Sequence, residues 1–495
     1  MKKTKYLHIA IIILGIIFIS IPVFHSNLWF DESYSVGMAN KSFIDIWNIG
    51  SNDVHPILYY WILHIIYLIF GTNLYLYRII SVIPLAILGI LGYTHIRKDF
   101  GEKEGILFSF FTFFLPIASV YSGEIRMYTW AMLFVTLMAI YAYRIYKNSS
   151  TKNWIIFAIF SLASAYIHYY ALATAGVINL ILFIYLLKKG LKQKSYTKEL
   201  KCFTISAIAQ IVLYIPWLLC LIKQIFGVAK GFWIPKLSIE TLIQTFCFQF
   251  TGDLDTMCAP QWVSITLGLI LLAYCIYCII INKGEKLAGK LAIGVYLIVF
   301  SVMAIVSIEA PIFYPRYFLN LTGLFIFFMA FFMAKDKQKI LTIIVCAITF
   351  LTAVFVNLNV IKMNYAENNK LPIEYVKQDL QQGDMILFGN RGSGFAISMQ
   401  FENVPNCFYD YDNWNVEPAY RAFGKEMIYT NSLDVFEDYK GRIWLVDSDN
   451  YSIYEKFKEE YGDKIILFNS DYNFSLLFVC GYIILSLVFK NNRYF

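Results

Sequence analysis

The sequence has little charge for its length. Only 15% of its 495 residues are Asp, Glu, Lys or Arg, whereas 59% are hydrophobic and 18% are aromatic. The mean hydropathy is +0.58. Such a composition is typical of proteins with many membrane spans and excludes a water-soluble protein. The formal net charge of +7 comes from short Lys and Arg clusters between apolar runs, which indicates cytoplasmic loops and no nucleic-acid partner.

Cysteine pairs are also lacking. The nine cysteines are an odd number, and their spacings are not those of a metal site. Cys275 and Cys278 form a Cys-x-x-Cys sequence, but they lie inside an apolar run, where buried thiols are usually inert. Cys247 and Cys258 share one predicted outer loop and could form a disulfide. The pattern excludes a disulfide framework and argues against redox or zinc chemistry.

Charged residues are absent from the middle of the apolar runs. Ion-coupled transporters usually need such residues, so their absence argues against one. The glycine-containing run from Gly389 to Gly394 lacks the Gly-Lys-Ser/Thr ending of a phosphate-binding loop, and we expect a turn there.

Long apolar runs are what the sequence does contain. A helix needs about 20 residues to cross about 30 Å of hydrocarbon. About eleven runs approach this length, at residues 7–25, 76–95, 105–121, 127–146, 153–168, 170–187, 202–222, 262–282, 289–308, 317–334 and 340–359. The first run follows a basic N-terminus and no cleavage site comes after it, so we expect a retained signal anchor with a cytoplasmic N-terminus.

The segment from Pro56 to Phe70 is apolar but short, and His64 interrupts it. If it crossed the membrane, the later basic loops would lie outside; if it lies flat, they all lie in the cytoplasm, as the positive-inside rule demands. We therefore predict an interfacial helix. The resulting topology is that of a multi-pass protein of the cell membrane. It places outside the cell residues 26–75, 122–126, 168–170, 223–261 and 309–316, and everything after residue 360.

The composition becomes mixed and polar after residue 360. Strand-like runs at 384–388, 442–446 and 464–468 alternate with predicted helices at 373–382 and 451–461. This alternation predicts a small extracytoplasmic α/β domain over residues 360–495, following a polytopic α-helical membrane domain over residues 1–359. The last apolar run, 474–489, fits either a buried strand or a short twelfth span.

Ionisable residues collect at the predicted outer ends of the spans. Asp31 and Glu32 follow the first span, and no other acidic pair on the chain is so placed. The same side holds Asp53, His55, Arg78, Glu124, Arg126, His168 and Arg316. A single Arg or His at a membrane boundary is often an anchor. Carboxylates are not anchors, and several loops contribute to one side, so the group indicates chemistry.

Carboxylates beside arginines fit a transferase that uses a phosphate-activated donor. A carboxylate can take the proton from an acceptor hydroxyl as general base, while guanidinium groups hold the phosphate. Phosphate leaves without being protonated, so one base suffices, whereas glycosidases need two carboxyl groups. Aromatic residues on this side could stack on a sugar or form an interfacial belt; they are Trp29, Phe30, Tyr59, Tyr60, Trp61 and Tyr128.

Short motifs along residues 1–335 carry a family resemblance. They are Phe30-Asp31-Glu32, the segment from Asp53 to Trp61, that from Tyr77 to Ser81, that from Ser122 to Tyr128, that from Ile167 to Tyr170, and Pro315-Arg316-Tyr317. In their order and common sidedness they resemble the polyprenyl-phosphate-sugar-dependent glycosyltransferases of the GT-C superfamily. The resemblance is to the dolichyl-phosphate-mannose protein mannosyltransferase and lipid A aminoarabinose transferase group. The chain departs from this pattern where Ile57 replaces a second proline.

This resemblance implies an inverting transfer of one sugar from a polyprenyl-phosphate donor to an extracytoplasmic protein, lipid or cell-surface glycan. It implies Asp31 as the general base and Glu124 as a second catalytic residue. The expected substrate-binding residues are Glu32, Asp53, His55, Arg78, Arg126, Tyr128, His168, Tyr169, Arg316 and Tyr317, with Arg78 and Arg126 foremost for the donor phosphate. No spacing demands a cofactor, although a divalent metal could bind Asp31, Glu32 and His55.

Two other functions are alternatives. A flippase or polymerase partner in surface glycan assembly would bind a lipid-linked sugar without transferring it, and predicts a polar path through the bilayer that the sequence lacks. An oligosaccharyltransferase would carry a Trp-Trp-Asp-Tyr-Gly signature, and the sequence Asp412-Asn413-Trp414-Asn415 is not a substitute.

Overall fold

The computed structural model divides the chain into two compact units. One comprises Met1–Phe24, Gly50–Tyr59 and Tyr75–Ile361, and the other comprises His25–Ile49, Tyr60–Leu74 and Lys362–Phe495. Most of the first outer segment thus groups with the C-terminal region. The residues that the structure describes are 2–228, 234–252, 259–282, 284–336, 339–366, 371–389, 395–396, 398–401, 403–410, 421–423, 427–436, 439, 441–448, 453–461, 465–469, 473–476 and 480–489.

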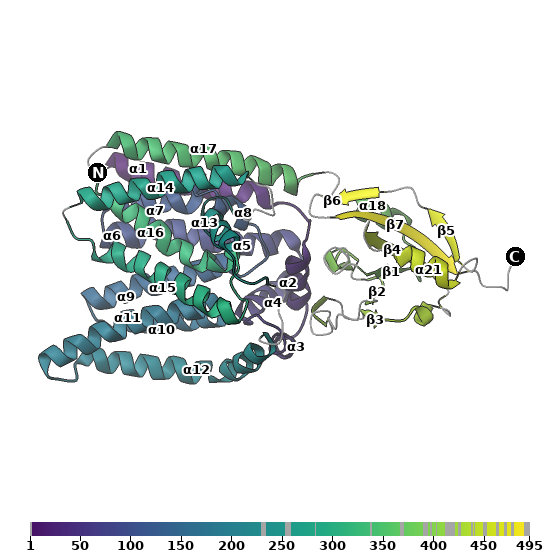
Figure 1. The fold of residues 1–495 in the computed structure, drawn as a ribbon, viewed down its shortest axis with the longest axis horizontal. Helices are drawn as coiled ribbons and strands as arrows, with labels where there is room; N and C mark the ends of the chain where they lie inside the picture. Colours follow the sequence, from purple (N-terminus) through teal and green to yellow (C-terminus); the bar gives the residue numbers. More distant parts are fainter. Residues whose placement is uncertain are drawn as a thin grey trace. The chain divides into compact units, whose positions relative to one another are not determined.

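The first unit is a bundle of helices (Figure 1). They are α1 (Lys2–Ser20), η1 (Ile21–Val23), α5 (Leu74–Leu91), η2 (Gly92–Ile96), α6 (Arg97–Asp99), α7 (Glu102–Phe114), α8 (Ile117–Tyr121), α9 (Tyr128–Lys147), α10 (Thr151–Ile167), α11 (Tyr169–Gln193), α12 (Lys198–Val228), α13 (Ile239–Thr251), α14 (Gln261–Ile281), α15 (Leu287–Glu309), η4 (Pro315–Leu321), α16 (Thr322–Met333) and α17 (Lys339–Asn364).

Nine helical segments of the described chain are long and apolar enough to cross a membrane. They are Lys3–Val23, Leu74–Asp99, Tyr128–Lys147, Tyr169–Gln193, Lys198–Phe226, Gln261–Ile281, Leu287–Glu309, Pro315–Met333 and Lys339–Asn364. Of the two other predicted runs, 153–168 forms α10, with 17 residues. The run 105–121 forms α7 and α8, which separate at Leu115 because a residue before proline avoids helical geometry. The chain is a multi-pass membrane protein.

The centre of the bundle is α16. All its residues are buried, whereas α12 lies at the periphery with 17% of its apolar window covered. A helix that is apolar all round belongs inside a protein or in a membrane. The aromatic rings of α16 contact neighbouring elements. The centroid of the Phe325 ring, for example, lies 5.9 Å from that of the Phe250 ring.

One helix lies in a segment that the sequence predicts only as a loop, 223–261. This is α13, which begins where the Ser238 hydroxyl accepts a hydrogen bond from the Thr241 N–H at 3.1 Å. The Thr322 hydroxyl donates to Gln249 Oε1 at 2.8 Å and joins α13 to α16. Cys247 is buried on α13, and its proposed partner Cys258 lies outside the described residues.

The second unit contains short helices from the first outer segment. They are α2 (Phe30–Ala39), α3 (Phe43–Gly50) and α4 (Leu58–Phe70), the last two of which run past the unit's boundaries. His64 Nδ1 lies 2.9 Å from the Ala39 carbonyl, joining α4 to the end of α2. The predicted interfacial helix corresponds to α4, whose 13 residues would rise only about 20 Å; its place at the interface stays a prediction.

The rest of the second unit is an α/β sheet domain (Figure 1). Its elements are α18 (Leu371–Asp379), β1 (Met385–Phe388), β2 (Asn406–Tyr409), β3 (Ile428–Thr430), η6 (Leu433–Phe436), β4 (Arg442–Ser448), α21 (Ile453–Tyr461), β5 (Ile465–Asn469), β6 (Asn473–Leu476) and β7 (Cys480–Phe489). The strand order is β3-β2-β1-β4-β7-β5, with β6 beside β7. The first four strands are parallel, and β7 is antiparallel to its neighbours. The described residues of the run 474–489 therefore lie in β6 and β7.

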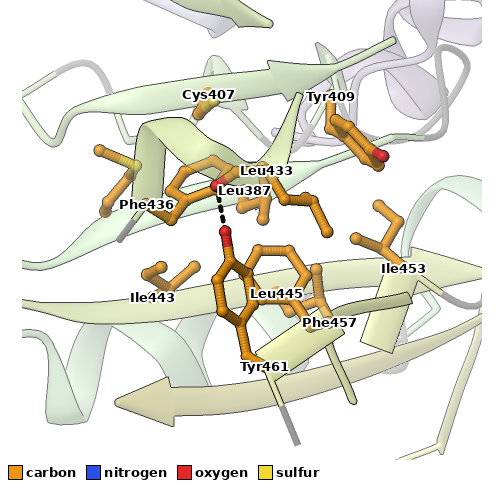
Figure 2. Packing of buried hydrophobic residues seen from close by; sticks show 11 residues of the cluster. Leu387, Cys407, Tyr409, Leu433, Phe436, Ile443, Leu445, Ile453, Phe457 and Tyr461 are labelled. Carbon is orange, nitrogen blue, oxygen red and sulfur yellow. Dashed lines mark hydrogen bonds between the residues drawn. The ribbon is translucent and has the colours of Figure 1, made fainter. Parts of the chain in front are cut away.

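Each face of this sheet buries its own hydrophobic cluster. Alternate residues of a strand point to opposite faces, so Leu387 and Leu445 share one face, where Figure 2 shows them packed with Phe457 and Tyr461 of α21. The Tyr461 hydroxyl donates to the Leu433 carbonyl at 2.7 Å. Phe388 must point to the other face, and its ring centroid lies 5.2 Å from that of Phe395.

An ion pair ties β4 to the segment before β1. Arg442 donates from Nη2 to Asp384 Oδ2 at 2.8 Å, and the Trp444 indole donates to the same oxygen at 2.8 Å. Burial raises the pKa of Asp384, but these hydrogen bonds outweigh burial and hold the pKa below its usual value.

Candidate active site

A chain of three polar side chains lies in the first unit. Arg126 Nη2 is 3.2 Å from His55 Nε2, and His55 Nδ1 is 3.3 Å from Asp53 Oδ2. An arginine can only donate hydrogen bonds, so His55 Nε2 accepts and the ring proton sits on Nδ1, from which it donates to Asp53. Asp53 and His55 thereby orient the buried guanidinium of Arg126.

Arg78 holds the turn that carries Glu124. Its Nη1 donates to the Gly123 carbonyl at 2.7 Å, and its side chain is buried. The turn closes where the Arg126 N–H donates to the Glu124 carbonyl at 2.7 Å. A Cβ on Gly123 would lie 2.7 Å from Val23, so only glycine allows this approach. Arg78 therefore has a structural contact beside any contact with substrate.

His168 stands at the junction of α10 and α11, in a group of rings. Its Nδ1 accepts from the Tyr170 N–H at 3.2 Å, which caps α11 and leaves the proton on Nε2. Its ring centroid lies 5.2 Å from that of Tyr317 and 5.8 Å from that of Tyr128. The predicted residues His168, Tyr128 and Tyr317, from three separate parts of the sequence, thus form one cluster.

The electrostatics of this cluster favour an anion. Burial, with smaller contributions from His55, Arg126 and Arg316, lowers the pKa of His168 to about 3. Arg316 is buried on η4, with its Cζ 4.8 Å from the centre of the Tyr314 ring. Guanidinium groups can hold a phosphate by forked hydrogen bonds.

Tyr169 contacts a different set of residues. Its hydroxyl donates to Gln224 Oε1 and accepts from the Trp217 indole at 3.2 Å. Gln224 also donates to the Gly50 carbonyl at 2.9 Å. Gln224 and Trp217 are absent from the sequence-based list, and the only signal for Gln224 was an amide directly after Lys223 at the end of a span. This network ties α11 and α12 to the segment that precedes Asp53.

The acidic pair lies in the second unit, at the start of α2. Asp31 and Glu32 occupy its first turn. Glu32 is buried, and its Oε2 accepts from the Trp29 N–H at 3.4 Å, as a carboxylate at the third helical position does in a capping box. Asp31 is only half-buried. The geometry gives Glu32 a structural contact and leaves Asp31 the more accessible carboxylate.

The candidate metal ligands are Asp31, Glu32 and His55. In the described ranges, no group of three or more His, Cys, Asp or Glu could hold a metal ion. Asp31 and Glu32 belong to one unit and His55 to the other.

A cavity lies elsewhere in the first unit. Its volume is about 230 Å³, and side chains of α9, α11, α15 and α16 line it, among them Thr136, Tyr143, Tyr185 and Leu291. None of the predicted site residues lines it.

Comparisons with known proteins bear on the fold and the family. Residues 54–230, roughly a third of the chain, match the family model described as dolichyl-phosphate-mannose-protein mannosyltransferase. This range contains His55, Arg78, Glu124, Arg126, Tyr128, His168 and Tyr169. No curated protein matches the chain.

The fold is similar to that of ArnT from Cupriavidus metallidurans. The crystal structure of apo ArnT matches with a TM-score of 0.61 and 10% identity, covering 97% of each chain. That of ArnT bound to undecaprenyl phosphate matches with a TM-score of 0.59, 10% identity and the same coverage of 97%. At this identity the likeness establishes the fold. The family match and the fold together confirm the resemblance that the motifs predicted.

Proposed function

We propose that the chain is an inverting glycosyltransferase that moves one sugar from a polyprenyl-phosphate donor to an extracytoplasmic protein, lipid or cell-surface glycan. The observation that carries this proposal is the cluster of His55 with the buried residues Arg126, His168 and Arg316. It combines guanidinium groups with rings, and most of it lies in the range that matches the mannosyltransferase family model.

In this proposal Arg126 and Arg316 bind the donor phosphate, and Tyr128 and Tyr317 lie against the sugar. Asp31 takes the proton from the acceptor hydroxyl. The acceptor oxygen then forms its bond to the anomeric carbon from the face opposite the phosphate, the bond from that carbon to the phosphate oxygen breaks, and polyprenyl phosphate leaves. This attack inverts the anomeric carbon, and the anionic leaving group needs no general acid.

The lipid donor also accounts for the location that we propose. Nucleotide sugars in the cytosol cannot reach a site on the outer face of the cell membrane, whereas a donor carried by a membrane lipid can. Protease added to intact spheroplasts should cleave within residues 26–75 and 371–461. Cleavage of these segments only after lysis would contradict the orientation.

Loss of the gene, followed by mass spectrometry of surface lipids, glycans and glycoproteins, tests the reaction. The expected result is the loss of one sugar from one acceptor class, restored by the wild-type chain and not by an Asp31→Asn variant. Restoration by that variant would contradict the base assignment. Unchanged acceptors with accumulated lipid-linked sugar on the inner leaflet would favour a flippase.

A further inference from the structure

The helix that carries Asp31 packs against side chains of the C-terminal domain, within one compact unit. The Phe30 ring centroid lies 5.8 Å from that of Phe395 and 5.4 Å from that of Phe423. Phe395 and Phe423 stack on each other at 4.0 Å, and both are buried. We call these three rings, Phe30, Phe395 and Phe423, the aromatic clamp.

The residues of α2 that contact the C-terminal domain lie on a single face of the helix. Tyr34 also contacts Phe423, with ring centroids 5.9 Å apart. Phe30, Tyr34 and Gly37 are spaced by four and three residues, so they lie on the same side of the helix. Asp31 follows Phe30 and points about 100° away from it around the axis. The clamp contacts one face, and the direction of Asp31 is fixed through the rotation of the helix.

Gly37 makes this contact tight. A Cβ built on Gly37 would lie 2.1 Å from the Ala422 carbonyl oxygen and 3.0 Å from the Phe423 Cα. A side chain at this position must therefore push α2 away from the backbone that carries Phe423. The approach depends on glycine, although α2 as an isolated helix would gain from alanine.

Hydrogen bonds within the same compact unit hold the segment before α2. Asn27 Nδ2 donates to the Asn364 carbonyl at 2.9 Å, and Gln400 Nε2 donates to the Ser26 carbonyl at 3.0 Å. At the other end of α2 the Ala39 carbonyl contacts His64 of α4. The helix is thus fixed at its start, along one face and at its end.

The clamp occupies a particular place on the sheet. Phe395 contacts Phe388, the last residue of β1, and Phe408 near the end of β2, at 5.2 Å and 5.1 Å. These are the carboxyl ends of parallel strands, where open α/β sheets commonly bind their ligands. Here rings that contact α2 lie at that edge.

We propose that the C-terminal domain positions the catalytic base: the aromatic clamp and the Gly37 contact set the rotation of α2 and so aim Asp31 at the acceptor hydroxyl. Phe395, Phe423 and Gly37 are positioning residues. This inference rests on the proposed function for the role of Asp31. A displacement of a reacting group by about 1 Å can lower a rate about 100-fold, so a small rotation of α2 should reduce turnover.

The test uses the full chain in detergent with three variants, Gly37→Ala, Phe423→Ala and Phe457→Ala. Phe457 is the matched control, because its ring lies in the cluster with α21 on the other face of the sheet. Sugar transfer is measured with a donor in which undecaprenyl phosphate carries tritiated mannose, and then with one in which it carries aminoarabinose. Amide hydrogen exchange of residues 30–39 is measured in parallel.

For Gly37→Ala and Phe423→Ala we expect kcat to fall at least tenfold with donor KM within about twofold of wild type, and α2 to exchange faster. Phe423→Leu should recover part of the rate. Phe457→Ala should lower the unfolding temperature of the C-terminal domain and keep kcat. Wild-type kcat in both Gly37→Ala and Phe423→Ala, or unchanged exchange of α2 in them, would overturn the proposal.

An Asp31→Asn variant separates this proposal from the proposed function. If that variant is inactive while Gly37→Ala and Phe423→Ala turn over normally, positioning by the C-terminal domain is wrong and the base assignment stands. If Asp31→Asn transfers sugar at the wild-type rate, the base assignment is wrong and the role of the clamp in catalysis falls with it.

Discussion

The two units hold their parts of the proposed site by different means. In the first unit Arg126 contacts His55, and His55 contacts Asp53. In the second unit Asp31 lies on a helix of ten residues whose packed face contacts rings from the sheet domain. Donor binding should therefore depend on the packing of the helices in the first unit. The position of the base should depend on the C-terminal domain.

The largest effect that separates the units should come from the acidic pair. Asp31→Asn keeps the shape of the side chain but removes the base, so we expect kcat to fall by about 10²- to 10⁴-fold with unchanged binding of undecaprenyl phosphate. The matched control is Glu32→Gln, which keeps an oxygen for the Trp29 N–H and should retain most activity. Steady-state transfer rates and binding of the labelled lipid decide the outcome. Equal losses in both variants would erase the distinction between the two carboxylates.

The cation cluster of the first unit should give the opposite kinetic signature. Arg126→Ala removes a charge-assisted contact to phosphate, worth about 1.5–3 kcal/mol, or roughly 10- to 150-fold in affinity for undecaprenyl phosphate. Arg144→Ala is the control, since Arg144 Nε donates to Asp99 at 2.7 Å in a predicted cytoplasmic loop. Isothermal titration with undecaprenyl phosphate in detergent measures the difference. Similar affinities for both variants would remove Arg126 from the phosphate site.

Asp53 should act through His55 and not directly. Asp53→Ala removes the acceptor that holds the Nδ1 proton, so the ring and the Arg126 contact lose their orientation. One such hydrogen bond is worth about 1 kcal/mol, and we expect donor KM to rise about three- to tenfold with kcat nearly unchanged. Asp53→Asn keeps an acceptor oxygen and should restore most of the wild-type KM. A direct contact with substrate would make Asn as harmful as Ala.

Sequence reasoning could single out candidate residues of the first unit, but not the contacts of the second unit. Arg126, His168 and Tyr317 stand out because polar or aromatic motifs at span ends are rare in an apolar chain. The predicted alternation of cytoplasmic and outer loops puts all three on the outer side. Phe395 and Phe423 carry no such signal, because single rings in a mixed polar segment have no periodicity. The strands β2 and β3 are only four and three residues long, and β7 is apolar enough to resemble a span. The sequence gives no sign that Gly37 is special, because its role depends on the close approach of the backbone at Ala422 and Phe423.

The smallest effect concerns pH and the first unit alone. The folded chain lowers the pKa of His168 from 6.5 to about 3, chiefly through burial. The unfolded chain therefore binds a proton between these values that the folded chain does not. The contribution to stability is complete above about pH 6.5 and is lost as the pH falls towards 3. His168→Asn removes this titration, and its side chain can still cap α11. Thermal unfolding in detergent at pH 7.5, 6.0 and 5.0 should show a smaller loss of stability for this variant than for the wild type. If the unfolding temperatures of the variant and the wild type fall in parallel with pH, other groups carry the pH dependence. The α2 variants should respond to pH as the wild type does, because His168 belongs to the other unit.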